Sequence, residues 1–272
     1  MITTEENVMT DTSGINPNVP HQARVWDYLG GGKNNYEADR IAAEYILQSY
    51  PQMESVVRQA RAFQGRAVRF LVKEAGIRQF LDVGTGLPTL DHTHDVAQRA
   101  DPTCRIVYVD NDPLVLTHAQ ALLSSSPEGR CAYIEADARD PEAILRAAAG
   151  TLDFTRPIAL MLFGVMGTVY DDDEARALVR RFMDALPSGS HLVFEDGTNV
   201  VVPDAAKEVE QLVEEGRAYD YRLRTPEQIA LFFEGLEVLE PGVVSVSRWR
   251  PEDSTWGAPD EVDAFGGVGR KA

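Results

Sequence analysis

Short apolar segments alternate with longer amphipathic segments along most of the chain. Each apolar run stops at an acidic or glycine-rich position, as parallel strands do when their carboxyl ends face a ligand. The expected strands are residues 80–83, 106–110, 134–137, 158–169 with the exit loop, and 191–195. Because predicted helices separate these strands, we expect a doubly wound α/β fold, with helices on both faces of a mostly parallel sheet.

Helical periodicity and capping signals define the expected helices. Apolar residues recur at helical spacing over residues 53–75, and Gly76 is a stop signal. A further helix is expected after residue 112, with a buried stripe at Leu116, Ala119 and Leu123. Four more are expected after residue 140, over 171–185, over 205–215, and from the Thr225 capping box to Gly235. Residues 236–249, interrupted at Pro241, are expected to form two final strands.

The corner after the first strand holds the most informative motif. Gly84 and Gly86 let the backbone turn tightly and approach a ligand closely. A pyrophosphate would be repelled by the neighbouring Asp82 carboxylate, and Thr89 stands where a nicotinamide enzyme usually has a third glycine. A positively charged cofactor fits better, and S-adenosylmethionine carries both an ammonium and a sulfonium. We therefore expect a site for S-adenosylmethionine.

Two aspartates close the next two strands. Asp110 can accept hydrogen bonds from both ribose hydroxyls, and Asp137 can accept one from the adenine amino group. Either aspartate alone could instead be a helix cap, because aspartate is favoured at that position. Their occurrence in order after the glycine corner favours the cofactor interpretation.

The net charge of the chain restricts the kinds of molecule that it is expected to bind. The formal net charge is -17, which argues against binding to nucleic acid or to an anionic membrane. The main basic run lies along the 53–75 helix and is interpreted as a solvated face: Arg58, Arg61, Arg66, Arg69 and Lys73. No apolar run approaches the ~20 residues of a membrane span, and the start of the chain lacks the pattern of a secretory signal. We expect a cytoplasmic protein.

Cysteine and acidic side chains do not form a convincing metal motif. Cys104 and Cys131 lack metal-like spacing and are expected to be buried thiols. The acidic run 171–174 could mimic a metal site, but aspartate and glutamate at a helix start favour a capping role. No metal is expected.

Longer motifs resemble one family. Residues 23–40 read ARVWDYLGGGKNNYEADR, and further matches lie at residues 82–89, 93–98, 224–228, 236–244 and in the closing GGVGRK. From residue 23 to residue 271 the chain resembles the class I S-adenosylmethionine-dependent methyltransferases. The resemblance is closest to an actinobacterial, DUF574-like family of S-adenosyl methyltransferases of unknown substrate.

The resemblance implies a seven-stranded Rossmann-like sheet whose last strand is antiparallel. We expect four parts: a frayed segment 1–20, an N-terminal helical lid 21–75, the cofactor-binding domain 76–250, and a tail 251–272 packed on it. Carried over residue by residue, Asp82, Gly84, Thr85 and Gly86 would face the methionine part, Asp110 the ribose, Asn111, Asp137 and Ala138 the adenine, and Phe163 and Gly164 the region near the sulfonium.

The N-terminal signature also carries expected cofactor contacts. Three consecutive glycines followed by Lys33 are interpreted as a lid, in which residues 30–34 close over the cofactor carboxylate. Tyr28, Gly32 and Lys33 are therefore expected at the cofactor, with Arg24 as a second cation. The alternative is a helix–helix connection in which Trp26 and Tyr28 are core aromatics.

Methyl transfer needs in-line placement of the acceptor and, for an oxygen or nitrogen acceptor, removal of a proton. Relatives commonly carry a histidine after the fourth strand, whereas this chain reads VMGTVY at 165–170. The candidates for a catalytic base are His21, His92, His94, Tyr170 and Asp196.

We expect an enzyme of secondary metabolism that transfers the methyl group of S-adenosylmethionine to a small molecule and leaves S-adenosylhomocysteine. Two alternatives stay open: intramolecular cyclisation or elimination of the sulfonium compound, and a non-catalytic sensor that binds it. The acceptor, its attacking atom and the oligomeric state are not specified by the sequence.

Overall fold

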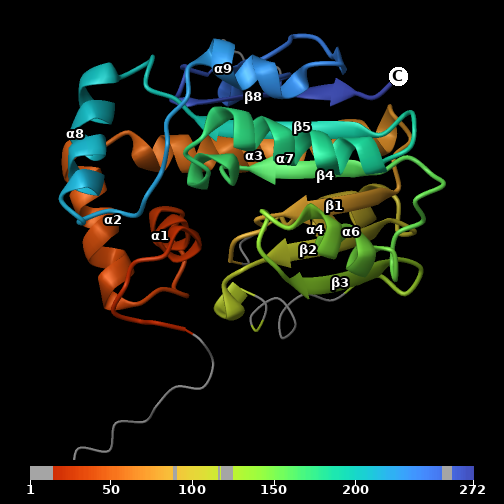
Figure 1. Ribbon diagram of the computed structural model, residues 1–272, viewed down its shortest axis with the longest axis horizontal. Coiled ribbons are helices and arrows are strands. Elements are labelled where there is room, and N and C mark those ends of the chain that lie inside the picture. The colour runs from red at the N-terminus through yellow and green to blue at the C-terminus, as the bar shows by residue number, and fades with distance from the viewer. Residues whose placement is uncertain (1–14, 88–90, 116, 118–124, 253–258) are drawn as a thin grey trace, which may run out of the picture.

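The strands of the computed structural model form one eight-stranded sheet (Figure 1). The structure describes residues 15–87, 91–115, 117, 125–252 and 259–272. Along the sheet the order is β3-β2-β1-β4-β5-β8-β6, and β7 pairs with β8 beside this path. The strands are β1 (Gln79–Val83), β2 (Arg105–Asp110), β3 (Arg130–Glu135), β4 (Ala159–Phe163), β5 (His191–Gly197), β6 (Glu237–Val238), β7 (Val244–Ser245) and β8 (Ala264–Arg270).

The first five strands are parallel, which confirms the expected doubly wound fold. β1 pairs with β2 on one side and with β4 on the other, so the strand order reverses at β1. β2 continues to β3, and β4 continues to β5. Ligands bind at such a reversal, outside the carboxyl ends of the strands. The topology therefore places a binding crevice next to the glycine corner after β1.

Helices cover both faces of the sheet. On one face α3 (Met53–Lys73) and α4 (Thr93–Ala100) pack on the inward apolar side chains of β1, β2 and β4. On the other face lie α6 (Pro141–Ala148), α7 (Asp172–Ala185), α9 (Pro226–Ala230) and the short turn η2 (Leu231–Phe233). Successive strand residues alternate between these two cores, as the pleat requires.

Three helices form a separate group beside the sheet. α1 (Gln22–Leu29), α2 (Glu37–Ser49) and α8 (Pro203–Glu214) share a third apolar cluster and stand at the left of Figure 1. This group includes Val25, Ile46 and Leu212, which are buried. Because α1 and α2 precede the sheet in sequence while α8 follows β5, distant segments combine to cap the carboxyl ends of the strands.

Strand β8 lies within residues 251–272, the expected tail, and belongs to a sheet of eight strands rather than the expected seven. It pairs antiparallel with β5 from His191↔Arg270 to Gly197↔Ala264, and this confirms the antiparallel strand implied by the resemblance. The two strands expected within 236–249 exist, but each has only two residues. Glycine is depleted in strands, so the glycine-rich ending did not suggest one. A Cβ at Gly266 would overlap the carbonyl oxygen of Phe194, and this close approach requires glycine.

Helix starts agree with the capping signals in the sequence. The Asp171 side chain accepts hydrogen bonds from the backbone N–H groups of Asp173 and Glu174, and Asp140 accepts one from Ala143. Thr225 forms the expected capping box with Gln228. The expected stripe at Leu116, Ala119 and Leu123, Thr89, and residues 1–14 of the segment 1–20 that was expected to be frayed lie outside the described residues.

Every helix within the described ranges is too short or too polar to cross a bilayer.

Candidate active site

A cavity of about 280 Å³ opens at the reversal point of the sheet, beneath α1 and α3. Its wall combines the corner after β1, the ends of β2 and β4, and the loop after β3. Eight residues expected at the cofactor line it: Gly84, Thr85, Gly86, Asp110, Asn111, Asp137, Ala138 and Phe163. The structure therefore brings together most of the residues that the sequence singled out along four separate strands.

The glycine corner fits closely against the loop after β4. Gly84 has a φ of 74°, a left-handed conformation that favours glycine, and a Cβ there would overlap the side chain of Val165. The backbone N–H groups of Gly84 and Thr85 donate to the carbonyl oxygen of Val109 at 2.8 and 3.2 Å. These bonds hold the corner against the end of β2. Because glycine has no side chain, the backbone of the corner forms this part of the cavity wall.

Asp110 links the corner to the next turn. Its Oδ2 accepts a hydrogen bond from the N–H of Gly86 at 2.9 Å, and its Oδ1 accepts one from Asp112 at 3.0 Å. Burial raises the pKa of Asp110, and these two backbone donors act in the opposite direction. Each oxygen keeps a second lone pair for a ligand hydroxyl. The carboxyl is thus fixed in position at the cavity wall.

Asp82 lies behind the wall rather than on it. It is buried, and its Oδ2 accepts a hydrogen bond from Thr93 Oγ1 at 2.6 Å. Thr93 in turn accepts one from Gln64 Nε2 at 2.9 Å. Burial raises the pKa of Asp82 to about 6. The structure gives it a contact with α4 and, through Gln64, with α3, and the expected contact with methionine stays a prediction.

Gly164 and the N-terminal connection lie outside the cavity lining. The Gly164 carbonyl accepts a hydrogen bond from Gln22 Nε2 at 3.0 Å. Tyr28 donates its hydroxyl to Glu44, and Lys33 is exposed. The backbone N–H of Gly32 donates to the Asp27 carbonyl oxygen at 2.7 Å.

The connection between α1 and α2 is held by the Asp27 side chain. Its Oδ2 accepts hydrogen bonds from the Asn34 N–H and from Asn35 Nδ2, both at 2.8 Å. Arg24 is buried and contacts Asp39 and Asp112 at 3.6 and 3.4 Å. This geometry matches the alternative interpretation of a helix–helix connection. Of the two aromatic residues of α1, Trp26 lines the cavity and Tyr28 does not.

Four charged residues of the cavity lining were not recognised as site residues from the sequence, namely Arg61, Arg139, Glu195 and Asp220, and two of them have shifted pKa values. Arg61 of α3 lines the cavity, which corrects its assignment to a solvated face. Burial lowers its pKa, and the nearby carboxylates Asp82, Glu195 and Asp27 oppose that shift. The available signal was its position four residues after the buried Val57, on the edge of the apolar stripe of the helix.

Arg66 is also not part of a solvated face, because its side chain donates hydrogen bonds to the carbonyl oxygens of Trp249 and Val246. Arg58 and Lys73 are exposed as expected.

Glu195 is the other unrecognised residue with a shifted pKa. It stands near the end of β5, opposite Phe163 of β4, and only 2% of it is exposed. Burial and the neighbouring Asp196 raise its pKa to about 8, while Arg61 acts in the opposite direction. A carboxyl in an apolar-patterned strand gives no local signal of function, so only the three-dimensional arrangement identifies it.

The candidates for a catalytic base lie in different parts of the structure, and one of them lines the cavity. His21 lines the cavity, where its Nδ1 lies 3.3 Å from Asp112 Oδ2. The other candidates lie outside the lining. His94 is buried against the Tyr108 hydroxyl at 2.9 Å, and burial lowers its pKa. His92 is buried at the start of α4, and Tyr170 is 53% exposed.

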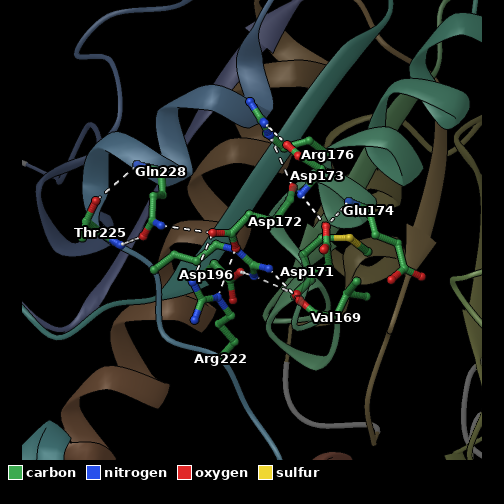
Figure 2. Close-up of polar contacts among 12 residues, drawn as sticks. Val169, Asp171, Asp172, Asp173, Glu174, Arg176, Asp196, Arg222, Thr225 and Gln228 are labelled. Atoms are coloured by element: carbon green, nitrogen blue, oxygen red, sulfur yellow. Dashed lines mark hydrogen bonds and ion pairs between the residues drawn. The ribbon is translucent and has the colours of Figure 1, made fainter.

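Asp196 belongs to a buried ionic network instead. Its Oδ2 accepts a hydrogen bond from Arg224 Nη1 at 2.8 Å, and both side chains are fully buried. Its Oδ1 accepts one from the Tyr221 hydroxyl. Arg224 also donates to Asp172 Oδ1 at 3.0 Å, and Figure 2 shows Arg222 and Gln228 reaching the same carboxylate. The acidic run 171–174 therefore caps α7 and anchors the segment after α8.

No cluster of metal-ligating side chains occurs in the ranges that the structure describes. Both cysteines are free thiols, with Cys104 buried and Cys131 partly buried.

Comparison with known proteins identifies the family. The model of the S-adenosyl methyltransferase family matches residues 9–272. The chain belongs to this family.

Solved structures agree with that assignment. A DUF574 family protein from Streptomyces avermitilis MA-4680 is 44% identical, with a TM-score of 0.88 over 93% of this chain and 98% of that chain. A protein from Thermobifida fusca YX is 40% identical, with a TM-score of 0.84 over 93% and 96%. The N-methyltransferase NodS from Bradyrhizobium japonicum WM9, solved with S-adenosylhomocysteine, shares the fold at 11% identity, with a TM-score of 0.50 over 91% and 98%. No curated protein matches.

Family membership settles the class of reaction. The chain is an S-adenosylmethionine-dependent methyltransferase, and S-adenosylmethionine is its methyl donor. This assignment favours methyl transfer over the other sulfonium reactions and over a non-catalytic sensor.

Proposed function

We propose that S-adenosylmethionine lies in the 280 Å³ cavity, with its ribose on Asp110, its adenine beside Asn111, Asp137 and Ala138, and its methionine part over the Gly84 corner. The observation that carries this proposal is the meeting of these residues, from the ends of β1, β2 and β3, around one cavity. Their donor and acceptor groups match the ligand. Carboxylates accept from ribose hydroxyls and the adenine amino group, and a backbone corner without Cβ atoms admits a close ligand.

Arg61 is the proposed partner of the cofactor carboxylate. Its guanidinium lies at the cavity wall beside the glycine corner, with Nη2 3.8 Å from the position that a Cβ on Gly86 would take. Within the described residues its side chain donates one hydrogen bond, from Nη1 to Gln64 Oε1 at 3.3 Å. A guanidinium with free donors suits a carboxylate, which it can bind through two parallel hydrogen bonds. The role first given to Lys33 thus passes to Arg61.

The acceptor is proposed to be a small molecule in the cytoplasm rather than nucleic acid. The net charge of -17 disfavours approach to a phosphate backbone. Arg61, the cation in the cavity lining that faces the glycine corner, is committed to the cofactor carboxylate in this proposal.

Calorimetry with S-adenosylhomocysteine tests the placement. Folded wild-type protein is expected to bind one molecule per chain, and Gly84→Val should abolish binding because the valine side chain would collide with the loop after β4. Gly76 provides a matched control, since it also has a positive φ of 72° but lies far from the cavity lining. If Gly84→Val and Gly76→Val bind equally well, the cofactor does not lie over this corner.

A further inference from the structure

A second, smaller cavity adjoins the proposed cofactor cavity. It lies between α2, α3 and α8, and apolar side chains such as Ile46, Val56 and Val209 line most of it. Three residues line both cavities, namely Trp26, Glu195 and Tyr219. The two spaces therefore adjoin along these three residues, which we call the shared wall, and the second space is an apolar annex of the first.

The shared wall is built from three separate segments. Trp26 comes from α1, Glu195 from β5, and Tyr219 from the segment after α8. Trp26 Nε1 donates a hydrogen bond to the Tyr219 hydroxyl at 2.9 Å, and this bond links the indole and phenol side chains. Tyr219 packs edge-on against Tyr221, which the Asp196–Arg224 network holds in place. The buried network thus fixes the wall.

Polar groups in the annex divide into paired and unpaired ones. Asp263 is paired, because it accepts hydrogen bonds from the Tyr50 hydroxyl and from the backbone N–H groups of Val201 and Val202. The Glu195 carboxyl receives no hydrogen bond from the described residues, although it is 2% exposed. Thr198 Oγ1 likewise lacks a partner within the described part and lines the annex. Buried polar groups are normally hydrogen-bonded, so the unpaired Thr198 Oγ1, beside a Glu195 carboxyl that lines both cavities, indicates a polar ligand atom there.

We propose that the annex binds the methyl acceptor, a flat and mainly apolar molecule bearing an N–H or O–H group, and that the Glu195 carboxylate accepts the proton of that group. This inference rests on the proposed position of the cofactor. Among the described residues, Glu195 is the carboxyl that lines both spaces, whereas His21 lines the cofactor cavity only.

The proposed step is a direct displacement. The acceptor nitrogen or oxygen forms a bond to the methyl carbon, the carbon–sulfur bond breaks with its electron pair retained by sulfur, and the acceptor proton passes to Glu195. The positive charge of the sulfonium favours the ionised carboxyl before transfer and disappears as transfer occurs. Apolar walls exclude water from the acceptor, which strengthens the hydrogen bond to Glu195.

Phenol and toluene are suitable probes, because they differ by a hydroxyl in place of a methyl group. Their dissociation constants would be measured by ligand-observed NMR titration with saturating S-adenosylhomocysteine at pH 9, above the pKa of about 8 for Glu195, so that its carboxyl is ionised. In wild-type protein the O–H of phenol can donate to Glu195. In Glu195→Leu this acceptor is gone, so the preference for phenol relative to toluene should fall by about 10-fold or more, as for loss of a hydrogen bond to a charged group.

Two tryptophan variants of α8 locate the probes. Val209→Trp fills the annex and should abolish binding of both compounds, whereas Glu208→Trp places the same indole on the exposed face and should leave both constants unchanged. If Val209→Trp loses S-adenosylhomocysteine affinity and hence its fold is in doubt, Ala206→Leu replaces it as a smaller obstruction of the same space.

The outcomes separate the two proposals. Failure of phenol to bind while S-adenosylhomocysteine binds would overturn the annex proposal alone. So would phenol binding that Val209→Trp does not change, or a phenol preference equal in wild type and Glu195→Leu. Failure of folded wild-type protein to bind S-adenosylhomocysteine would overturn the cofactor placement instead.

Discussion

Arg224 and Asp196 form an ion pair from which solvent is completely excluded: Nη1 lies 2.8 Å from Oδ2, and neither side chain is exposed. Arg224 also donates to the carbonyl oxygens of Met166 and Val169, at 2.7 and 2.6 Å. One guanidinium therefore ties the segment after α8 to β5 and to the loop after β4. That segment carries Tyr219, which belongs to the wall between the two cavities.

Removing this guanidinium should destabilise the fold strongly. In Arg224→Met the carboxylate of Asp196 stays buried without its cation, and breaking such a pair costs about 3 to 5 kcal/mol. Urea unfolding measures the loss. Arg222→Met is the matched control, because Arg222 pairs with the same Asp172 but its side chain is 39% exposed, and it should cost less than about 1 kcal/mol. Equal losses in the two variants would contradict the anchoring role of Arg224.

Asp110 should govern cofactor affinity through the ribose. Asp110→Ala removes the acceptor for the hydroxyls and should weaken S-adenosylhomocysteine binding by about 1 to 3 kcal/mol, measured by calorimetry. Glu135→Ala is the control, because Glu135 pairs with Asp110 in the sheet register but is exposed. An unchanged affinity in Asp110→Ala would remove the carboxyl from the site.

Arg61 should contribute to cofactor affinity only through the carboxylate of the ligand. In Arg61→Met the affinity for S-adenosylhomocysteine is expected to fall about 10-fold or more, because a charged hydrogen bond to the carboxylate is lost. Methylthioadenosine has no carboxylate, so its affinity should hardly change. Arg58→Met, an exposed position on the same helix, controls for the loss of positive charge. Equal weakening of both ligands would mean that Arg61 does not bind the carboxylate.

Stability should depend on pH through Glu195. Its pKa is about 8 in the folded protein and about 4.5 ordinarily, so the folded state holds a proton that the unfolded state has released between these values. Stability therefore falls as pH rises from about 4.5 to about 8 and stays lower above that. Glu195→Gln cannot ionise and lacks this decrease.

Thermal unfolding of both proteins at pH 5 and pH 9 tests this. The charged and titratable neighbours Arg61, Asp196, Tyr219 and Tyr221 are present in both proteins and contribute to both curves. The variant should gain stability over wild type at pH 9 relative to pH 5. A difference that is the same at both pH values would show that Glu195 is already ionised in the fold at pH 5.

The fold and part of the candidate site could be predicted because their signals are local. Gly84 and Asp110 stand at ends of apolar runs, and the chain order of parallel strands brings such ends to one edge. Glu195 and Arg61 carry no such signal: one sits within an apolar strand, the other within a charged helix, and only packing decides that both face a cavity. The same holds for Trp26, whose place at the wall depends on Tyr219 nearly two hundred residues away. The position of the antiparallel strand β8 was not predicted, because close contact with β5 demands glycine where strand propensity would favour larger residues.

The most direct test of the account is a crystal structure of the protein with S-adenosylhomocysteine. The account predicts the ribose hydroxyls within hydrogen-bond distance of Asp110, the carboxylate of the ligand on Arg61, and its sulfur on the side of the cavity that Glu195 lines. A ligand bound elsewhere, or one whose sulfur lies at the opposite end of the cavity from Glu195, would contradict it.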